Sequence, residues 1–207
     1  MGSLLIIGAF VVGCVASYLG WIPVWLIGGD LAMWVLFALM FQVGMGIGSD
    51  DRLKEIFSSL KPRILLVPLA TIVGTLAATA LVSLTISRWN IADVLAIGSG
   101  FGYYSLSSIL ITSLKEGTLG QQIAVELGTI ALMANVFREM LTLLFAPLMV
   151  KYFGPLAPIC AGGATSMDVT LPTITRFSGR DWVFISVVHG VIVDASVPFL
   201  VSLFCSL

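Results

Sequence analysis

Five ionisable side chains lie inside apolar stretches of this 207-residue chain, namely Arg138, Glu139, Asp168, His189 and Asp194. A charged group within the hydrocarbon of a membrane is costly, so each such residue is a candidate for a functional role. Carboxylates hold cations or protons, a guanidinium pairs with carboxylates, and an imidazole exchanges a proton near neutral pH. The residue types therefore indicate chemistry on cations or protons at membrane depth.

One of these acids belongs to a polar stripe on a helix. Asn135, Glu139 and Thr142 recur at i, i+4 and i+7, so they share one helical face. Arg138 is turned about 100° away from Glu139, where it could pair with another acid, neutralise Glu139 in part or contact the carboxylate of a solute. An ion pair that only locks helices together is the structural alternative. A buried carboxylate that holds a proton would instead serve as a proton carrier.

Two stretches rich in Gly and Ser or Thr interrupt the apolar sequence, at 98–108 and 161–172. Lipid cannot hydrogen-bond a loosened backbone, so such a break at membrane depth occurs only where protein or a water-filled cavity pairs the freed groups. Interrupted helices place helix ends at mid-membrane, where N-termini attract anions while carbonyls and acids hold cations. The two stretches therefore predict broken helices of a transporter.

The second interruption carries the strongest single candidate, Asp168, among Thr165, Ser166 and Thr170. Hydroxyl groups are good partners for a charged group, and the set would suit a zwitterionic or cationic solute. Asp168 could also simply cap the N-terminus of a half-helix. Both roles are compatible with one another.

Four further polar residues are weaker candidates. Ser105 and Ser107 lie in the first interruption, where Gly lets the backbone approach a ligand, although Gly and Ser also serve plain helix packing. His189 and Asp194 are five residues apart and point to different faces of their helix. His189 could relay protons or bridge helices, and either residue could be a polar group satisfied by packing.

The composition assigns the chain to the integral membrane proteins. Hydrophobic residues make up 58% of the chain and charged residues 10%, whereas soluble domains carry about a quarter of charged residues. The net charge of −1 comes without a basic block, which argues against a nucleic-acid partner. The cysteines are single and lack metal-ligand spacing, so we expect neither a metal nor a cofactor. We expect one integral membrane domain over residues 1–207.

Apolar runs of about 20 residues, the length that crosses a membrane, give an all-α fold with seven segments: 3–20, 29–49, 63–86, 91–113, 119–150, 155–175 and 182–206. The sixth is the weakest in hydropathy and could be a re-entrant element. On this map most basic residues fall on one side: Arg52, Lys54, Lys61, Arg63, Lys115, Arg176 and Arg180. Because Lys and Arg in short loops stay cytoplasmic, the map predicts a cytoplasmic N-terminus and an external C-terminus. The same asymmetry favours a crossing for the sixth segment.

Four blocks of this sequence, in this order, resemble the signature blocks of the bacterial LysO lysine-exporter family. They are residues 100–108 (Gly-Phe-Gly-Tyr-Tyr-Ser-Leu-Ser-Ser), 135–139 (Asn-Val-Phe-Arg-Glu), 163–172 (Gly-Ala-Thr-Ser-Met-Asp-Val-Thr-Leu-Pro) and 189–190 (His-Gly). The similarity covers essentially the whole chain, and residues 41–48 resemble the family's Gly-containing helix end.

The resemblance implies export of L-lysine and its toxic analogues across the inner membrane, in exchange for protons. It also implies kinship with the broken-helix architecture of cation/proton antiporters and bile-acid symporters. The family roles carry over onto Glu139, as the intramembrane acid, and onto Asp168. Full-length members carry an additional N-terminal portion with another intramembrane acid, so this chain resembles their larger, C-terminal component.

Two other functions and one assembly state stay open at this point. The same acids could hold Na⁺ in a cation/proton antiporter without an organic substrate. The chain could also be a subunit that is active only with a separate N-terminal partner chain, or it could assemble as a homodimer. An intramembrane enzyme is not expected, since the chain has no His-Glu-x-x-His motif, no Gly-x-Ser-x-Gly elbow and no pair of aspartates with protease spacing.

Overall fold

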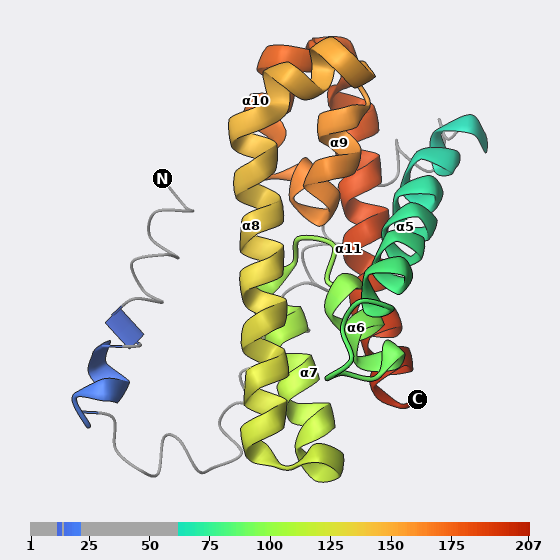
Figure 1. Ribbon diagram of the computed structural model, residues 1–207. Coiled ribbons are helices and arrows are strands. Elements are labelled where there is room, and N and C mark those ends of the chain that lie inside the picture. The colour runs from blue at the N-terminus through green and yellow to red at the C-terminus, as the bar shows by residue number, and fades with distance from the viewer. Residues whose placement is uncertain (1–11, 14, 22–61) are drawn as a thin grey trace.

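The computed structural model describes residues 12, 13, 15–21 and 62–207 (Figure 1). Within these residues all regular structure is helical, which agrees with the all-α prediction. The expected second span, 29–49, and most of the first span lie outside the described residues, as does the Gly-containing helix end at 41–48.

Among the residues that the structure describes, three helices are long and apolar enough to cross a membrane. They are α5 (Pro62–Ser83), α8 (Gln121–Phe153) and α11 (Val183–Cys205), the last preceded by the short 3₁₀ helix η2 (Arg180–Trp182). A 20-residue helix is about 30 Å long, the thickness of the hydrocarbon. These helices match three of the seven expected spans. In Figure 1, α5 and α11 run in the opposite direction to α8.

The fourth expected span, 91–113, does not cross from one end of the molecule to the other. It consists of α6 (Ile91–Gly98) and α7 (Tyr104–Leu119). Lys115 Nζ, near the end of α7, lies 2.7 Å from Asp93 Oδ1 in the first turn of α6. The two helices therefore lie side by side and the chain turns back at residues 99–103, which form the tip of the α6–α7 hairpin (Figure 1).

The sixth expected span, 155–175, also turns back. It contains α9 (Ala157–Gly162), the 3₁₀ helix η1 (Gly163–Met167) and α10 (Leu171–Ser178). The hydroxyl of Ser178, at the end of α10, donates a hydrogen bond to the carbonyl oxygen of Pro155, before the start of α9 (2.9 Å). The re-entrant alternative is therefore the one that the structure has, and the prediction of a crossing is wrong.

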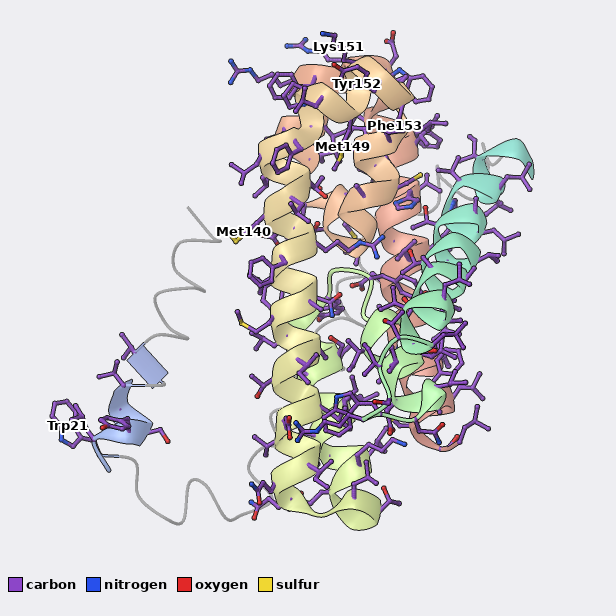
Figure 2. All side chains as sticks on the ribbon, viewed as in Figure 1. Trp21, Met140, Met149, Lys151, Tyr152 and Phe153 are labelled. Carbon is purple, nitrogen blue, oxygen red and sulfur yellow. The ribbon has the colours of Figure 1, made fainter. Side chains whose placement is uncertain are left out.

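The charge argument for that crossing was wrong because both segments turn back. Two reversals cancel, so α10 and the start of α11 still lie at the end of the molecule where α5 begins (Figure 1), and these elements carry or adjoin Arg176 and Arg180. Lys151 lies at this same end, next to Tyr152 and Phe153 (Figure 2). Lys115, which forms an ion pair with Asp93, lies at the opposite end of the molecule and not at the expected one.

The two hairpins enter the molecule from opposite ends and their tips meet in the middle (Figure 1). The backbone N–H of Ala164 in η1 donates to the carbonyl oxygen of Phe101 in the first tip (2.9 Å). Phe101 is fully buried and belongs to a core that also contains Leu106, Leu127 and Val193, from α7, α8 and α11. Large apolar side chains on α5 and α8 are exposed, for example Leu66 and Leu144, as expected for surfaces that face lipid.

Candidate functional site

The polar stripe of α8 faces the two hairpin tips. Asn135 and Glu139 each retain 4% of their surface exposed and Thr142 is fully buried, as the spacing predicts. The hydroxyl of Thr142 donates to the carbonyl of Arg138, one turn earlier (2.9 Å). The stripe thus puts a carboxyl and a carboxamide at the place where the tips meet.

Asn135 binds the tip of the α6–α7 hairpin. Its Oδ1 accepts a hydrogen bond from the backbone N–H of Gly102 (2.7 Å), and its Nδ2 donates to Ser107 Oγ (3.3 Å) and to the carbonyl of Ala131 (2.8 Å). Because this tip is not helical, the Gly102 N–H needs a partner outside a helix. The Asn135 carboxamide therefore supplies the hydrogen-bond acceptor that a helical backbone would otherwise offer to the Gly102 N–H.

The backbones of the two tips are in direct contact, which requires glycine. Gly102 has φ +99°, and a Cβ at this position would lie 2.9 Å from the carbonyl oxygen of Gly162. Gly163 has φ +63°, and a Cβ there would overlap the carbonyl oxygen of Phe101. Only glycine combines these backbone angles with this approach, so the Gly-rich composition of both interruptions is explained by how closely they pack.

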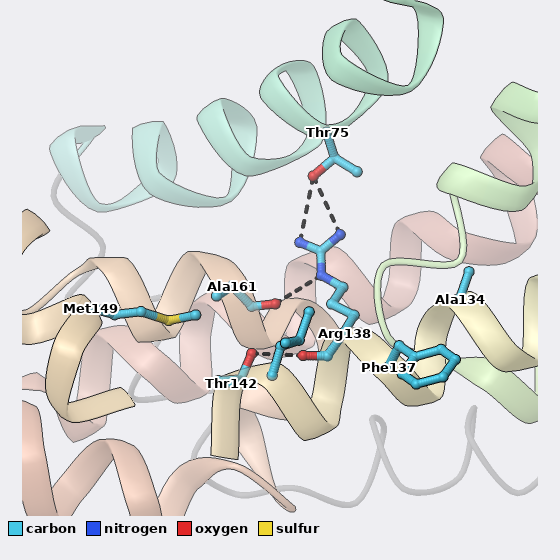
Figure 3. A pocket seen from close by; sticks show the side chains of 8 residues that line it. Thr75, Ala134, Phe137, Arg138, Thr142, Met149 and Ala161 are labelled. Carbon is cyan, nitrogen blue, oxygen red and sulfur yellow. Dashed lines mark hydrogen bonds between the residues drawn. The ribbon is translucent and has the colours of Figure 1, made fainter. Parts of the chain in front are cut away.

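Arg138 binds the tip of the other hairpin. Its Nε donates to the carbonyl of Ala161 (2.8 Å) and its Nη2 donates to the carbonyl of Cys160 (3.0 Å), both in the last turn of α9. Both terminal nitrogens also lie 3.4 Å from Thr75 Oγ1 on α5 (Figure 3). The structure thus gives Arg138 a backbone-binding role, which differs from the roles that the sequence suggested.

A cavity of about 370 Å³ lies next to the Arg138 guanidinium, between α5, α8 and α9 (Figure 3). Its walls are largely apolar, with polar groups from Thr75, Arg138 and Thr142. The remaining lining residues are Ala134, Phe137, Leu141, Met149 and Ala161. Its volume is in the range of small-molecule pockets.

His189 joins three elements in the interior. The fully buried ring has Nδ1 2.9 Å from Ser166 Oγ in η1 and Nε2 2.9 Å from Thr71 Oγ1 on α5. Ser166 and Ser186 are further joined through Ser186 Oγ, which donates to the carbonyl of Ser166 (2.7 Å). The imidazole therefore ties the second hairpin to α5 and α11, in agreement with its helix-bridging alternative.

The carboxylates gather around the tyrosines at the start of α7. Asp168 ends η1 and is exposed, with its Oδ1 2.5 Å from the backbone nitrogen of Val169, while Asp194 on α11 is 6% exposed. Tyr103 lies within electrostatic range of Asp168 and Asp194, and Tyr104 within that of Asp168 and Glu139. Three acids, on α8, on α11 and directly after η1, therefore act electrostatically on the start of α7.

The other predicted hydroxyls are engaged locally. Ser107 Oγ donates to the carbonyl of Tyr103 (2.8 Å) and Thr165 Oγ1 to that of Gly162 (2.9 Å), so both stabilise the hairpin tips. Ser105 is half-buried in the first turn of α7. Among the described residues no group of three His, Cys, Asp or Glu side chains could hold a metal ion.

Sequence reasoning missed two features of this region. One is the threonine row of α5, in which Thr71 binds His189 and Thr75 binds Arg138. The spacing of four residues, which continues to Thr79, was the available signal. The other is the buried pair of Asp93 and Lys115, of which Lys115 was expected in a loop.

The chain is similar to known proteins along nearly its whole length. The profile of a family described as "Lysine exporter LysO" matches residues 7–205. A protein of Escherichia coli K12 named "Lysine exporter LysO" is 32% identical over 177 residues, which cover 84% of this chain and 55% of that protein. A Haemophilus influenzae protein, named as a candidate lysine exporter, is 29% identical over 206 residues, 97% of either chain. The chain thus spans little more than half of the Escherichia coli protein and nearly all of the other. No solved structure matches the chain.

Proposed function

The chain belongs to the lysine exporter LysO family, and from this premise we propose that it is a secondary transporter that exports L-lysine and lysine analogues across the inner membrane. The family description names a transporter, which agrees with the expectation that the chain is not an enzyme. Apolar helices long enough to span a membrane are in keeping with this role.

The observation that carries the proposal is that Glu139, Asp168 and Asp194 all act electrostatically on the tyrosines at the start of α7, next to the first hairpin tip. Lysine carries two ammonium groups and one carboxylate at neutral pH. A site with three carboxylic acids matches a substrate with an excess of positive charge better than an anionic or apolar one. The tyrosine hydroxyls of Tyr103 and Tyr104 add donors that a substrate carboxylate could use.

In this proposal Glu139 and Asp168 bind the ammonium groups of lysine in competition with protons. A proton that arrives from outside neutralises an acid and releases the solute there, which gives lysine/proton antiport. Each hairpin enters the molecule from one end. Separation of its tip from the neighbouring helices would therefore open a path from the site to that end only. The basic end, with Lys151, Arg176 and Arg180, faces the cytoplasm in this arrangement.

Counterflow in proteoliposomes tests the substrate. Vesicles loaded with unlabelled lysine should accumulate radiolabelled lysine, and ornithine or arginine inside the vesicles shows how strict the preference is. Transport of ²²Na⁺ in exchange for protons without lysine counterflow would contradict the proposal and favour a cation/proton antiporter. Because the match covers only 55% of the Escherichia coli relative, the assay is run with and without the N-terminal portion of that relative as a separate chain. Activity only in its presence would identify this chain as a subunit.

A further inference from the structure

We propose that Arg138 is a positioning residue that holds the end of α9 against α8 and α5, and that it does not bind the carboxylate of the transported amino acid. The second half of this statement rests on the proposed function. The first half concerns only the fold of the α9–α10 hairpin.

The contacts of Arg138 are those of a helix C-terminal cap. The last carbonyls of a helix have no partner inside it and carry the negative end of the helix dipole. Cys160 and Ala161 occupy the last turn of α9, and each gives its carbonyl oxygen to the guanidinium (3.0 and 2.8 Å). The planar fork of an arginine reaches two neighbouring acceptors at once, which an ammonium cannot do with the same geometry.

Both edges of the guanidinium that could hold a carboxylate are in use. The edge formed by Nε and Nη2 binds the two α9 carbonyls, and the edge formed by the two terminal nitrogens faces Thr75 Oγ1 (3.4 Å). A substrate carboxylate bound by two parallel bonds would have to displace one of these sets. Displacement of the carbonyls would leave the end of α9 without its partners.

The position of Arg138 on α8 supports the same role. Arg138 and Glu139 point in directions about 100° apart, so the guanidinium faces α5 and the end of α9 while Glu139 lies on the helical face of Asn135. One turn earlier, Asn135 binds Gly102 in the opposite tip. α8 thus binds one hairpin tip through Asn135 and the other through Arg138, with Glu139 adjacent.

Loss of the Arg138 cap affects transport through the residues that follow α9. Immediately after Ala161 the chain turns at Gly162 and Gly163 into η1, and Asp168 directly follows η1 as its C-cap. Loss of the cap therefore loosens the segment that carries Asp168. We expect such a variant to weaken the site for every cationic ligand, whether or not the ligand has a carboxylate.

A native thiol allows the cap to be tested without any substrate. Cys160 is half-buried and gives its carbonyl to Arg138. In a chain with Cys14→Ala and Cys205→Ala, we expect R138K and R138Q to raise the rate at which a maleimide labels Cys160 by about tenfold or more. R88Q, which changes an exposed arginine paired with Glu126, should leave the rate unchanged. An unchanged rate in both Arg138 variants would overturn the positioning role, and R138K keeps the test valid if R138Q does not fold.

Whether Arg138 binds the substrate carboxylate is tested with two competitors of radiolabelled lysine. One is L-lysine itself, and the other is L-lysinamide, which keeps both ammonium groups and lacks the carboxylate. The proposal predicts that R138K weakens both competitors by the same factor. A loss confined to lysine would assign the carboxylate to Arg138 and contradict the proposal. If the unmodified chain does not bind lysine even with the N-terminal portion added, the proposed function fails while the labelling result still decides the role of the cap.

Discussion

Glu139 and Asp168 supply the same chemical group to the site from very different surroundings. Glu139 is buried on the long helix α8, whereas Asp168 is exposed at the end of a five-residue 3₁₀ helix. A helix interior fixes a side chain, while the end of a hairpin tip can move with the hairpin. Asp168 is therefore the acid that we expect to change its position during transport.

Gly102 is the residue whose substitution should show how closely the tips must pack. G102A places a methyl group 2.9 Å from the Gly162 carbonyl oxygen at a φ of +99°, so we expect a loss of about 1–3 kcal/mol of stability. Thermal unfolding in detergent measures the effect. G117A is the matched control, because Gly117 lies within α7 with open space around it, and alanine there should stabilise the helix by up to about 1 kcal/mol. Equal unfolding temperatures for the two variants would mean that the tips do not pack as described.

At the scale of elements, the ion pair of Asp93 and Lys115 joins the start of α6 to the last part of α7, at the end of the hairpin away from its tip. Both side chains are less than a tenth exposed, so K115M leaves a buried carboxylate without its partner and should cost about 3–5 kcal/mol. The double change D93L/K115M removes both charges and should recover most of that loss. R88Q, in an exposed pair with Glu126, should cost less than about 1 kcal/mol. A double variant as unstable as K115M would argue that the pair does not hold the hairpin closed.

The sequence predicted where helices lie along the chain better than it predicted in which direction each one runs. The Gly- and Ser-rich composition of residues 98–108 and 161–172 predicted where helices end, because loosened backbone needs small residues that pack closely. It could not show that the chain turns back there. Hydropathy measures only the apolar length of a segment, and a hairpin of two short helices has the same apolar length as one crossing. The long-range pairs that reveal the reversal, Asp93 with Lys115 and Pro155 with Ser178, join positions more than 20 residues apart.

The same limit applies to the site. Helical spacing predicted the stripe of Asn135, Glu139 and Thr142, since three residues on one helix need no knowledge of the fold. The partners of Arg138 could not be predicted in this way. They come from α5 and α9, and no pattern within α8 specifies which acceptors those helices present.

At the scale of the whole molecule, the part of the chain described by the structure has three long helices beside two hairpins that enter from opposite ends (Figure 1). This arrangement can be tested by single cysteines at Glu116 and Asp181, both exposed near helix ends, in a chain whose native cysteines are replaced. We expect an impermeant maleimide to label the two positions from opposite sides of the membrane, with position 181 on the cytoplasmic side. The seven-crossing map puts both positions on the same side, so labelling from one side only would contradict the hairpins.

The central claim is that acids gathered where the hairpin tips meet bind the ammonium groups of lysine. Its most direct test is equilibrium binding of radiolabelled lysine to the purified chain, together with its N-terminal partner if counterflow requires one. The variants are E139Q and D168N, and E126Q serves as a control at an exposed acid outside the site. We predict that E139Q and D168N each weaken lysine binding at least tenfold, while E126Q binds as the unmodified chain does. Unchanged lysine affinity in both E139Q and D168N would contradict the account.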